Sequence, residues 1–525
     1  MKNKALVSGS AVRINRSNIL KGTIILTLAG FVTRFIGFFY KIFLSNTMGA
    51  ELLGIYQLVF PVYGICFTIY ATGIQTTLSR LVAAEMGRRN PKNTYKILRI
   101  ALVLSVSLAF LLSVLVYKFS DVLAMRFLLE PRSAPSLRVL AIVFPFCGVT
   151  SCINGYYYGL KKAGVPASTQ LLEQITRVLV VYLLALYTGK GNLQVTCEMA
   201  VLGIVIGEII SCLYNFISIF VTKSPTALLV MGVDTNSKKY GGRHIIKNLL
   251  HMSIPLSANR LLINILHSIE AVMIPTMLRR FGLTIAEALS SYGILNGMSI
   301  PFILFPTAVI NALAVLLLPT ISEAQALNND KLIGKTTAVS IKYSLIIGIV
   351  STGLFIIFGM ELGKAVFHNT AAGSYLLVLA WLCPFIYLTT TLGSIINGLG
   401  KAHITFINSV IGSLCKILLI AILIPMYGIT GYLAALLVGQ LIITFLDSIS
   451  VIRYVHFPFD AVNSLLKPGM VVALSGFLLK KVFDYIQKIT QNSSALIILS
   501  FCLLFCAINI ILLIITHSVS RKDFR

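Results

Sequence analysis

Charge is scarce in this chain of 525 residues, and negative charge is the scarcest. Only 11% of the residues are charged, with 17 acids against 43 lysines and arginines, and 57% are hydrophobic. Ordinary globular proteins carry about 25% charged residues, so the composition excludes a soluble protein. The apolar runs reach spanning length and none alternates with period two, which argues against a β-barrel. The sequence therefore predicts an all-α integral membrane protein.

Motifs of enzymes and metal sites are also missing. The chain has no GxxxxGK[ST] nucleotide loop, no HExxH motif and no GxSxG motif. Its nine cysteines lie scattered, without CxxC or Cys/His spacing, so we interpret them as reduced small hydrophobic residues. We expect no enzymatic activity, no cofactor and no metal.

The net charge of +26 follows membrane topology rather than a nucleic-acid surface. Lysine and arginine concentrate in alternate short loops, and such loops mark the cytoplasmic side. The loops at 118–138 and 480–488 depart from this pattern. We expect a protein of the cytoplasmic membrane with both termini cytoplasmic, surrounded by membrane lipids and without a nucleic-acid partner.

Fourteen transmembrane helices are predicted, the first centred near residue 32 and the last near residue 505. A polar, glycine-rich linker at 222–246 follows the sixth span. It separates an N-half (residues 1–221, spans one to six) from a C-half (residues 247–457, spans seven to twelve). Residues 458–525 hold the last two spans and a cytoplasmic tail.

The N-half and the C-half resemble each other. ING occurs at 153–155 and again at 396–398, and 162–179 align with 401–418, which sets Arg177 against Lys416. Because each half has an even number of spans, the two repeats share one orientation. Two parallel six-helix repeats predict a transporter with its site between the halves, near mid-membrane.

Arg34 is the most unusual residue of the first apolar run, and Lys41 follows it by seven residues. Seven residues are two helical turns, so both side chains fall on one helix face. A charge at such depth costs roughly 2.5–3.5 kcal/mol on insertion scales. The cost falls where the face lines a wet cavity, and we expect this face to line one.

Span five carries Glu173 and Arg177 four residues apart, in the order that favours an ion pair. This is either a self-neutralising structural pair or the source of one charge shared with a substrate. Lys416 has no acid nearby in sequence, so it needs a partner from another helix or a ligand. Guanidinium and ammonium groups gathered in one cavity suit phosphate or carboxylate, and the candidates are Arg34, Lys41, Arg177, Arg260 and Lys416.

Other spans carry polar groups whose roles stay open. Span seven has a stripe at i, i+4 and i+7 that we predict to line the cavity, formed by Arg260, Asn264 and His267. Glu270 lies beside this stripe as a candidate for an ion pair or for coupling. Glu208 and Asp447 are acids that either coordinate a coupling cation or, as we favour, form helix–helix hydrogen bonds.

Three tyrosines of span two, Tyr56, Tyr63 and Tyr70, recur every seven residues and share one face. Such a face could stack sugar rings in the cavity, although packing is the commoner use of such spacing. We retain both interpretations.

Three stretches carry a family resemblance: TLAGFVTRFIGFFYKIFLSNTMGAELLGIYQLVFPVYG (27–64), ATGIQTTLSRLVAAE (71–85) and INGYYYGLKKAGVPASTQLLEQITR (153–177). Together they resemble the polysaccharide-biosynthesis branch of the multidrug/oligosaccharidyl-lipid/polysaccharide flippase superfamily. Within this branch the chain is most similar to the stage V sporulation protein B family, over nearly its whole length.

The resemblance implies a V-shaped bundle of spans one to six against spans seven to twelve, with the last pair packed outside. In the related lipid II flippases that pair borders a groove for the polyprenyl tail, and cavity cations hold the diphosphate. Arg34 matches the first cavity arginine of that family. The further arginines of those flippases, in spans two and eight, are absent here, so Arg177, Arg260 and Lys416 are expected to supply the charge.

The expected function is a flippase for undecaprenyl-diphosphate-linked peptidoglycan or polysaccharide precursors, working by alternating access and serving the spore cortex. Cell-wall synthesis enzymes are candidate partners. The alternative is a multidrug cation antiporter of the same fold, which needs a cavity acid that span one lacks. A non-transporting scaffold is a third hypothesis, which the short loops disfavour.

Overall fold

The computed structural model describes residues 16–88, 91–188, 193–221, 241–490 and 495–519. Within these ranges the chain is helical and has no strand, which confirms the all-α prediction. Most of the predicted linker, residues 222–240, and the charged terminal segments 1–15 and 520–525 lie outside the described residues.

The helices follow one another through short connections. The N-half contains α1 (Arg16–Phe67), the π-helix η1 (Thr68–Thr72), α2 (Gly73–Gly87), α3 (Pro91–Lys118), α4 (Ser120–Val122), η2 (Leu123–Phe127), η3 (Pro131–Ser133), α5 (Ala134–Ala141), α6 (Phe144–Gly159), α7 (Gly164–Thr188) and α8 (Cys197–Val221). The C-half contains α9 (Gly242–Arg280), α10 (Ile285–Gly293), η5 (Ile294–Ser299), α11 (Ile300–Leu304), α12 (Thr307–Ala326), α13 (Asp330–Phe367), α14 (Thr370–Leu379), η6 (Ala380–Leu382), α15 (Cys383–Gly398), α16 (Ala402–Tyr427) and α17 (Ile429–Tyr454). The chain continues through η7 (Val462–Leu466), α18 (Lys467–Thr490) and α19 (Ala495–Ile515).

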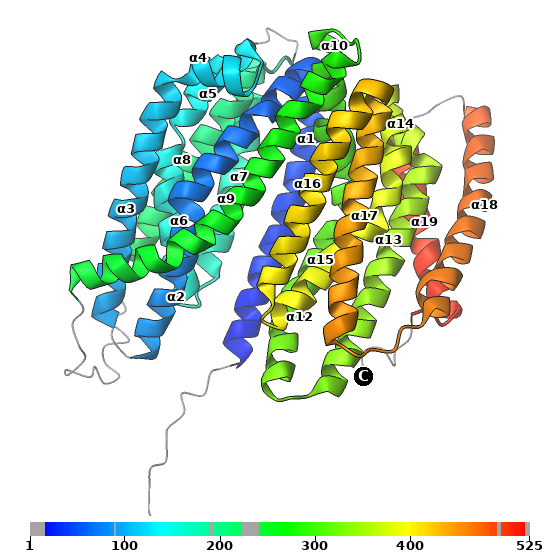
Figure 1. Cartoon of the computed structure of the whole chain (residues 1–525). Coiled ribbons are helices and arrows are strands. Elements are labelled where there is room, and N and C mark those ends of the chain that lie inside the picture. Colours follow the sequence, from blue (N-terminus) through cyan, green and yellow to red (C-terminus); the bar gives the residue numbers. More distant parts are fainter. Residues whose placement is uncertain (1–15, 89–90, 189–192, 222–240, 491–494, 520–525) are drawn as a thin grey trace, which may run out of the picture.

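The structure confirms a multi-pass helical protein but does not confirm the exact count of fourteen spans. The described residues hold 12 helices that are long and apolar enough to cross a membrane, or up to 13 if the bent pair Pro131–Ala141 and Phe144–Gly159 is one span. The first of them, Ile25–Gly87, has 63 residues and would be about 95 Å long if straight, against a hydrocarbon thickness of about 30 Å. It turns back at Gly49, whose φ of 76° is a left-handed conformation that favours glycine (Figure 1).

Proline breaks the region where span eight was predicted. Pro301 lies in the first turn of the short helix α11, and Pro306 is the N-cap of α12. Proline lacks an N–H group and ends or kinks a helix. The resulting run of α10, η5, α11 and α12 replaces one continuous helix.

The helices gather in two groups (Figure 1). Helices α3–α8 lie on one side and α12–α17 on the other, with α1 and α9 between them. Helix α9 packs against both groups, because it contacts α3 of the first and α16 of the second, as well as α1, η1 and α2. The Asn264 side chain fixes this packing by donating to the Gly64 carbonyl at 3.2 Å and to Thr68 Oγ1 at 2.6 Å. The last helices, α18 and α19, pack against α13 at the edge of the bundle.

Two glycines let α1 and α10 touch through their backbones. A Cβ atom on Gly293 would lie 2.0 Å from the Ala50 carbonyl oxygen, and one on Gly54 would lie 2.2 Å from the Leu289 oxygen. No side chain fits in so small a gap, so only glycine permits this crossing. It joins the N-half to the C-half close to Tyr56, which lines the cavity described next.

Candidate functional site

A cavity of about 590 Å³ lies where the N-half meets the C-half. Helices α1 and α7 supply one wall, and α11 and α12 with the residues between them supply the other. Its lining residues are Arg34, Gly37, Phe38, Tyr40, Lys41, Leu44, Tyr56, Gln57, Phe60, Gln174, Arg177, Pro301, Leu304, Phe305, Thr307 and Asn311. We call this space the central cavity.

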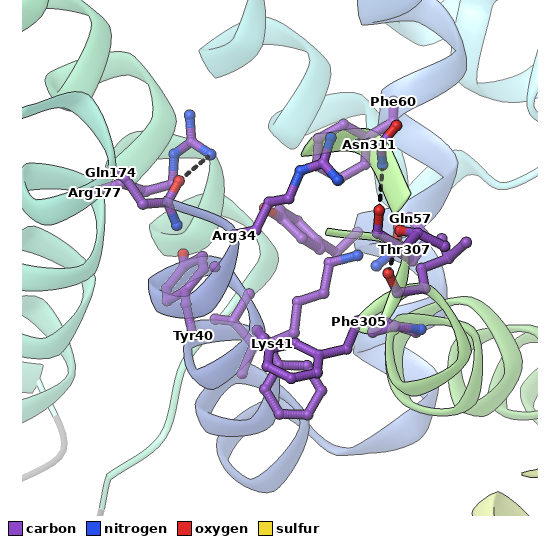
Figure 2. A pocket seen from close by; sticks show the side chains of 16 residues that line it. Arg34, Tyr40, Lys41, Gln57, Phe60, Gln174, Arg177, Phe305, Thr307 and Asn311 are labelled. Atoms are coloured by element: carbon purple, nitrogen blue, oxygen red, sulfur yellow. Dashed lines mark hydrogen bonds between the residues drawn. The ribbon is translucent and has the colours of Figure 1, made fainter. Parts of the chain in front are cut away.

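Three cations line the central cavity, and all belong to the N-half. Arg34 and Lys41 lie on one face of α1, as their spacing predicts, and both side chains are exposed to the open space. Figure 2 shows both reaching between Arg177 of α7 on one side and Asn311 of α12 on the other. Among the described residues neither Arg34 nor Lys41 forms an ion pair.

Arg177 differs from the other two cations because it has a partner on its own helix. Its guanidinium pairs with the Glu173 carboxylate one turn earlier, and its Nη1 lies 3.4 Å from Gln174 Oε1. Glu173 itself is not among the lining residues. None of the described residues that line the cavity is acidic, so the cavity attracts anions.

Neutral polar groups and aromatic rings complete the central cavity. Asn311 donates to the Thr307 carbonyl at 2.8 Å, which orients its amide at the start of α12. The rings of Phe38 and Phe305 are 4.8 Å apart and close the gap between α1 and the C-half. The cavity can therefore bind an anionic group through Arg34 and its neighbours while amides face the rest of the ligand.

Lys416, which we expected to hold the diphosphate, is not among the residues that line the central cavity. Its Nζ lies 2.6 Å from Glu270 Oε2 on α9, and the Tyr432 hydroxyl donates to the same carboxylate at 3.2 Å. The side chains of Lys416 and Glu270 are only 16% and 11% exposed. The lysine thus has the partner from another helix that its sequence environment required.

The predicted stripe of α9 is likewise not among the residues that line the central cavity. Arg260 is exposed, and Asn264 is used in the packing against Gly64 and Thr68. His267 is 56% exposed and lies 3.6 Å from Glu270. Helical spacing groups side chains on a face without saying what that face meets.

Of the three tyrosines, the structure brings only Tyr56 to the central cavity. Tyr70 is fully buried and packs against Phe144, with the ring centroids 5.7 Å apart. Tyr63 stacks on Phe67 at 5.7 Å. Tyr63 and Tyr70 are therefore core residues of the N-half, which is the packing interpretation of their spacing.

The acids Glu208 and Asp447 are buried away from the central cavity. Asp447 is fully buried and accepts from Asn408 of α16 at 2.8 Å, a helix–helix hydrogen bond of the kind we favoured. Glu208 is 6% exposed and forms no ion pair among the described residues. In the same ranges no group of three or more His, Cys, Asp or Glu residues is placed to hold a metal ion.

Sequence reasoning missed five polar groups of the central cavity, namely Tyr40, Gln57, Gln174, Thr307 and Asn311. Gln174 lies three residues before Arg177, on the same helix face, and this spacing was a usable signal. Burying an amide inside an apolar span costs free energy because the amide loses its hydration, as a buried charge does. Amides as well as charges could therefore have been used to find the cavity.

Comparison with known proteins places this geometry in a family. A sequence profile described as "Polysaccharide biosynthesis protein" matches residues 19–325, more than half of the chain. The chain belongs to this family. It is 25% identical over 512 residues to Stage V sporulation protein B of Bacillus subtilis (strain 168), covering 97% of this chain and 98% of that protein. This confirms the resemblance found in the sequence.

Solved structures show the same fold. The chain matches a structure described as "Lipid II flippase MurJ, inward closed conformation" with a TM-score of 0.69 at 16% identity, over 95% of this chain and 99% of the other. It matches an inward-facing multidrug resistance MATE family transporter of the MOP superfamily with a TM-score of 0.64 at 14% identity, over 80% and 94%. The protein is therefore a multi-pass membrane member of the polysaccharide biosynthesis protein family, and it has the fold of these flippase and transporter structures.

Proposed function

We propose that the protein is a flippase that moves undecaprenyl-diphosphate-linked peptidoglycan or polysaccharide precursors across the cytoplasmic membrane. The observation that carries this proposal is the charge of the central cavity. Arg34, Lys41 and Arg177 converge there, and no described lining residue is acidic. A diphosphate offers oxygen atoms to guanidinium and ammonium groups at once, and such charge-assisted hydrogen bonds are among the strongest in proteins.

The lining residues divide between two roles in this proposal. Arg34, Lys41 and Arg177 bind the diphosphate, whereas Tyr56 and the amides Gln57, Gln174 and Asn311 face the sugars. The polyprenyl tail stays in the membrane, near α18 and α19. Lys416, Tyr63 and Tyr70 have no place in this site.

The architecture we propose keeps fourteen spans, with two parallel repeats at 1–221 and 247–457 and two further spans at 458–525. Two observations support the repeats. Helix α7 packs on α8 as α16 packs on α17, and α6 and α15 both begin with a proline in the first turn after a break, Pro145 and Pro384.

Transport by this arrangement proceeds by alternating access, in which the N-half and the C-half rock around the central cavity. The driving force is an ion gradient or the membrane potential, which moves each net charge with about 2.3 kcal/mol per 100 mV. Both termini are cytoplasmic in this proposal, as the distribution of lysine and arginine indicates.

The cellular role we propose is the supply of precursors for the spore cortex, with cell-wall synthesis enzymes as partners. The support is the similarity to Stage V sporulation protein B over 97% of this chain.

A multidrug cation antiporter is the second candidate, and the likeness of fold to the MATE transporter favours it. A cation substrate requires a carboxylate in its binding cavity to offset the charge. The central cavity offers three cations instead. We therefore place this candidate second.

The experiment that tests the proposed function compares ligand classes on the purified protein in nanodiscs. Lipid II, undecaprenyl phosphate and tetraphenylphosphonium are titrated against the wild type and Arg34→Ala. A charge-assisted phosphate contact is worth about 1.5–3 kcal/mol, so Arg34→Ala should weaken binding of both lipids roughly ten- to a hundredfold. Binding of tetraphenylphosphonium alone would contradict the proposal and favour the antiporter.

A further inference from the structure

The Glu173–Arg177 ion pair on α7 differs from the ion pair of Lys416, the residue of the C-half that aligns with Arg177. Arg177 lines the central cavity but is held by an acid of its own helix, one turn away. Lys416 is held by Glu270 of a different helix, and the Tyr432 hydroxyl secures that carboxylate. The Lys416 pair therefore ties α16 to α9, whereas the Arg177 pair ties no two helices together.

The Glu173 carboxylate can separate from Arg177 because it forms few other interactions. Its side chain is 26% exposed, and among the described residues it has no hydrogen-bond partner besides Arg177. The pair can open by rotation of side chains, with the backbone of α7 unmoved. That backbone is fixed on α8, since a Cβ atom on Gly207 would lie 3.0 Å from the Glu173 carbonyl oxygen.

Arg177 retains unused donor capacity. Its Nε is buried and has no hydrogen-bond partner among the described residues, and its contact with Gln174 is long at 3.4 Å. A guanidinium group offers five N–H donors in a planar fork that matches phosphate as well as carboxylate. One carboxylate does not saturate it, so an incoming anion can share the guanidinium and then displace Glu173.

We infer that Glu173 stands in for the substrate's phosphate on Arg177 in the empty central cavity and competes with it when substrate enters. This inference rests on the proposed function. Glu173 is a positioning residue: it keeps Arg177 ordered while the cavity is empty and returns to it when the substrate leaves. A carrier needs binding that is favourable enough for entry and weak enough for exit. An internal competitor lowers the affinity of the cavity and thereby eases release.

The test uses undecaprenyl phosphate titrated into the full-length protein in nanodiscs. Glu173→Gln removes the competing charge at nearly constant shape, so the ligand should bind roughly two- to fivefold more tightly, as expected for a partly exposed pair within one helix. Glu173→Ala also removes the carboxylate, and it should likewise increase the affinity for undecaprenyl phosphate. Glu173→Asp, which keeps the charge, should stay near the wild type.

Two further variants separate competition from a merely structural effect. In an Arg177→Ala background, Glu173→Gln should bring no gain, because the group for which both anions compete is gone. The matched control is Asp121→Asn on α4, whose carboxylate pairs with Arg138 of α5 and is not a lining residue of the central cavity. It should leave the affinity unchanged.

The outcomes separate this inference from the proposed function. Tighter binding by Glu173→Gln that depends on Arg177 supports the exchange. Equal or weaker binding by both Glu173→Gln and Glu173→Ala, with the wild type still binding, overturns the exchange and leaves the flippase proposal standing. If the wild type binds no undecaprenyl phosphate, the proposed function and the exchange both fall.

Discussion

Arg177 of the N-half and Lys416 of the C-half align in the sequence, yet they serve different purposes in the structure. Arg177 lines the central cavity. Lys416 is half-buried, its Nζ lies 2.6 Å from Glu270 Oε2, and it is not a lining residue. The same position of the repeat therefore carries a cavity-lining charge, Arg177, in the N-half. In the C-half it carries Lys416, which forms an ion pair between two helices.

The cause of the difference is the position of the acid. Glu173 lies on the same helix as its partner, so the pair neutralises Arg177 without fixing it to a neighbour. Glu270 comes from α9, and its carboxylate also accepts from Tyr432. Among the described lining residues, the charge of the central cavity therefore comes from the N-half, while the C-half contributes the amide of Asn311, the hydroxyl of Thr307 and the aromatic ring of Phe305.

The largest effect should come from breaking the buried pair. Lys416→Met leaves Glu270 uncompensated among α9 and α16 and should cost about 3–5 kcal/mol of stability. Arg177→Met should cost less than about 1 kcal/mol, since Glu173 is more exposed and not tied to another helix. Thermal unfolding in detergent, followed by fluorescence, measures both. Equal losses of stability would show that the two pairs play the same structural role.

For ligand affinity the order should be reversed, with the larger loss at Arg177 and the smaller one at Lys416. Arg177→Met should weaken binding of undecaprenyl phosphate about tenfold, because one charge-assisted contact is lost. The double variant Lys416→Met with Glu270→Gln removes both buried charges together, which restores much of the stability. Its affinity should stay within about twofold of the wild type, given that neither residue lines the cavity. A tenfold loss of affinity in the double variant would show that Lys416 belongs to the binding site.

The smallest effect on ligand affinity should come from the C-half wall of the central cavity, which faces the sugars in our proposal. Asn311→Ala removes an amide that faces the sugars in our proposal, a neutral contact worth about 0.5–1.5 kcal/mol. Lipid II should therefore bind roughly two- to tenfold more weakly, while undecaprenyl phosphate binds as before. Microscale thermophoresis with both ligands provides the measurement. An equal loss for both ligands would place Asn311 at the phosphate instead.

Part of this site could be predicted from the sequence because it depends on local spacing. Arg34 and Lys41 had to share a face, and a cavity was the least costly place for that face. The position of Lys416 could not be predicted, because its partner Glu270 is distant in sequence and meets it only through the packing of α9 on α16.

The tyrosines show the same limit. Helical spacing placed Tyr63 and Tyr70 on one face but could not say whether that face meets the core or the cavity. Apolar length indicated a multi-pass helical protein, and the turn at Gly49 falls after the first predicted span, which is centred near residue 32. Local geometry was predictable, and the contacts between distant helices were not.

The most direct test of the central claim is the dissociation constant of undecaprenyl diphosphate for two matched charge reversals, Arg34→Glu and Arg260→Glu. Both arginines are exposed side chains on long helices, but only Arg34 lines the central cavity. We predict that Arg34→Glu weakens binding more than about a hundredfold, since an attraction becomes a repulsion, while Arg260→Glu changes it less than about twofold. Equal effects of the two substitutions, or none from Arg34→Glu, would contradict the account of the central cavity as the anion-binding site.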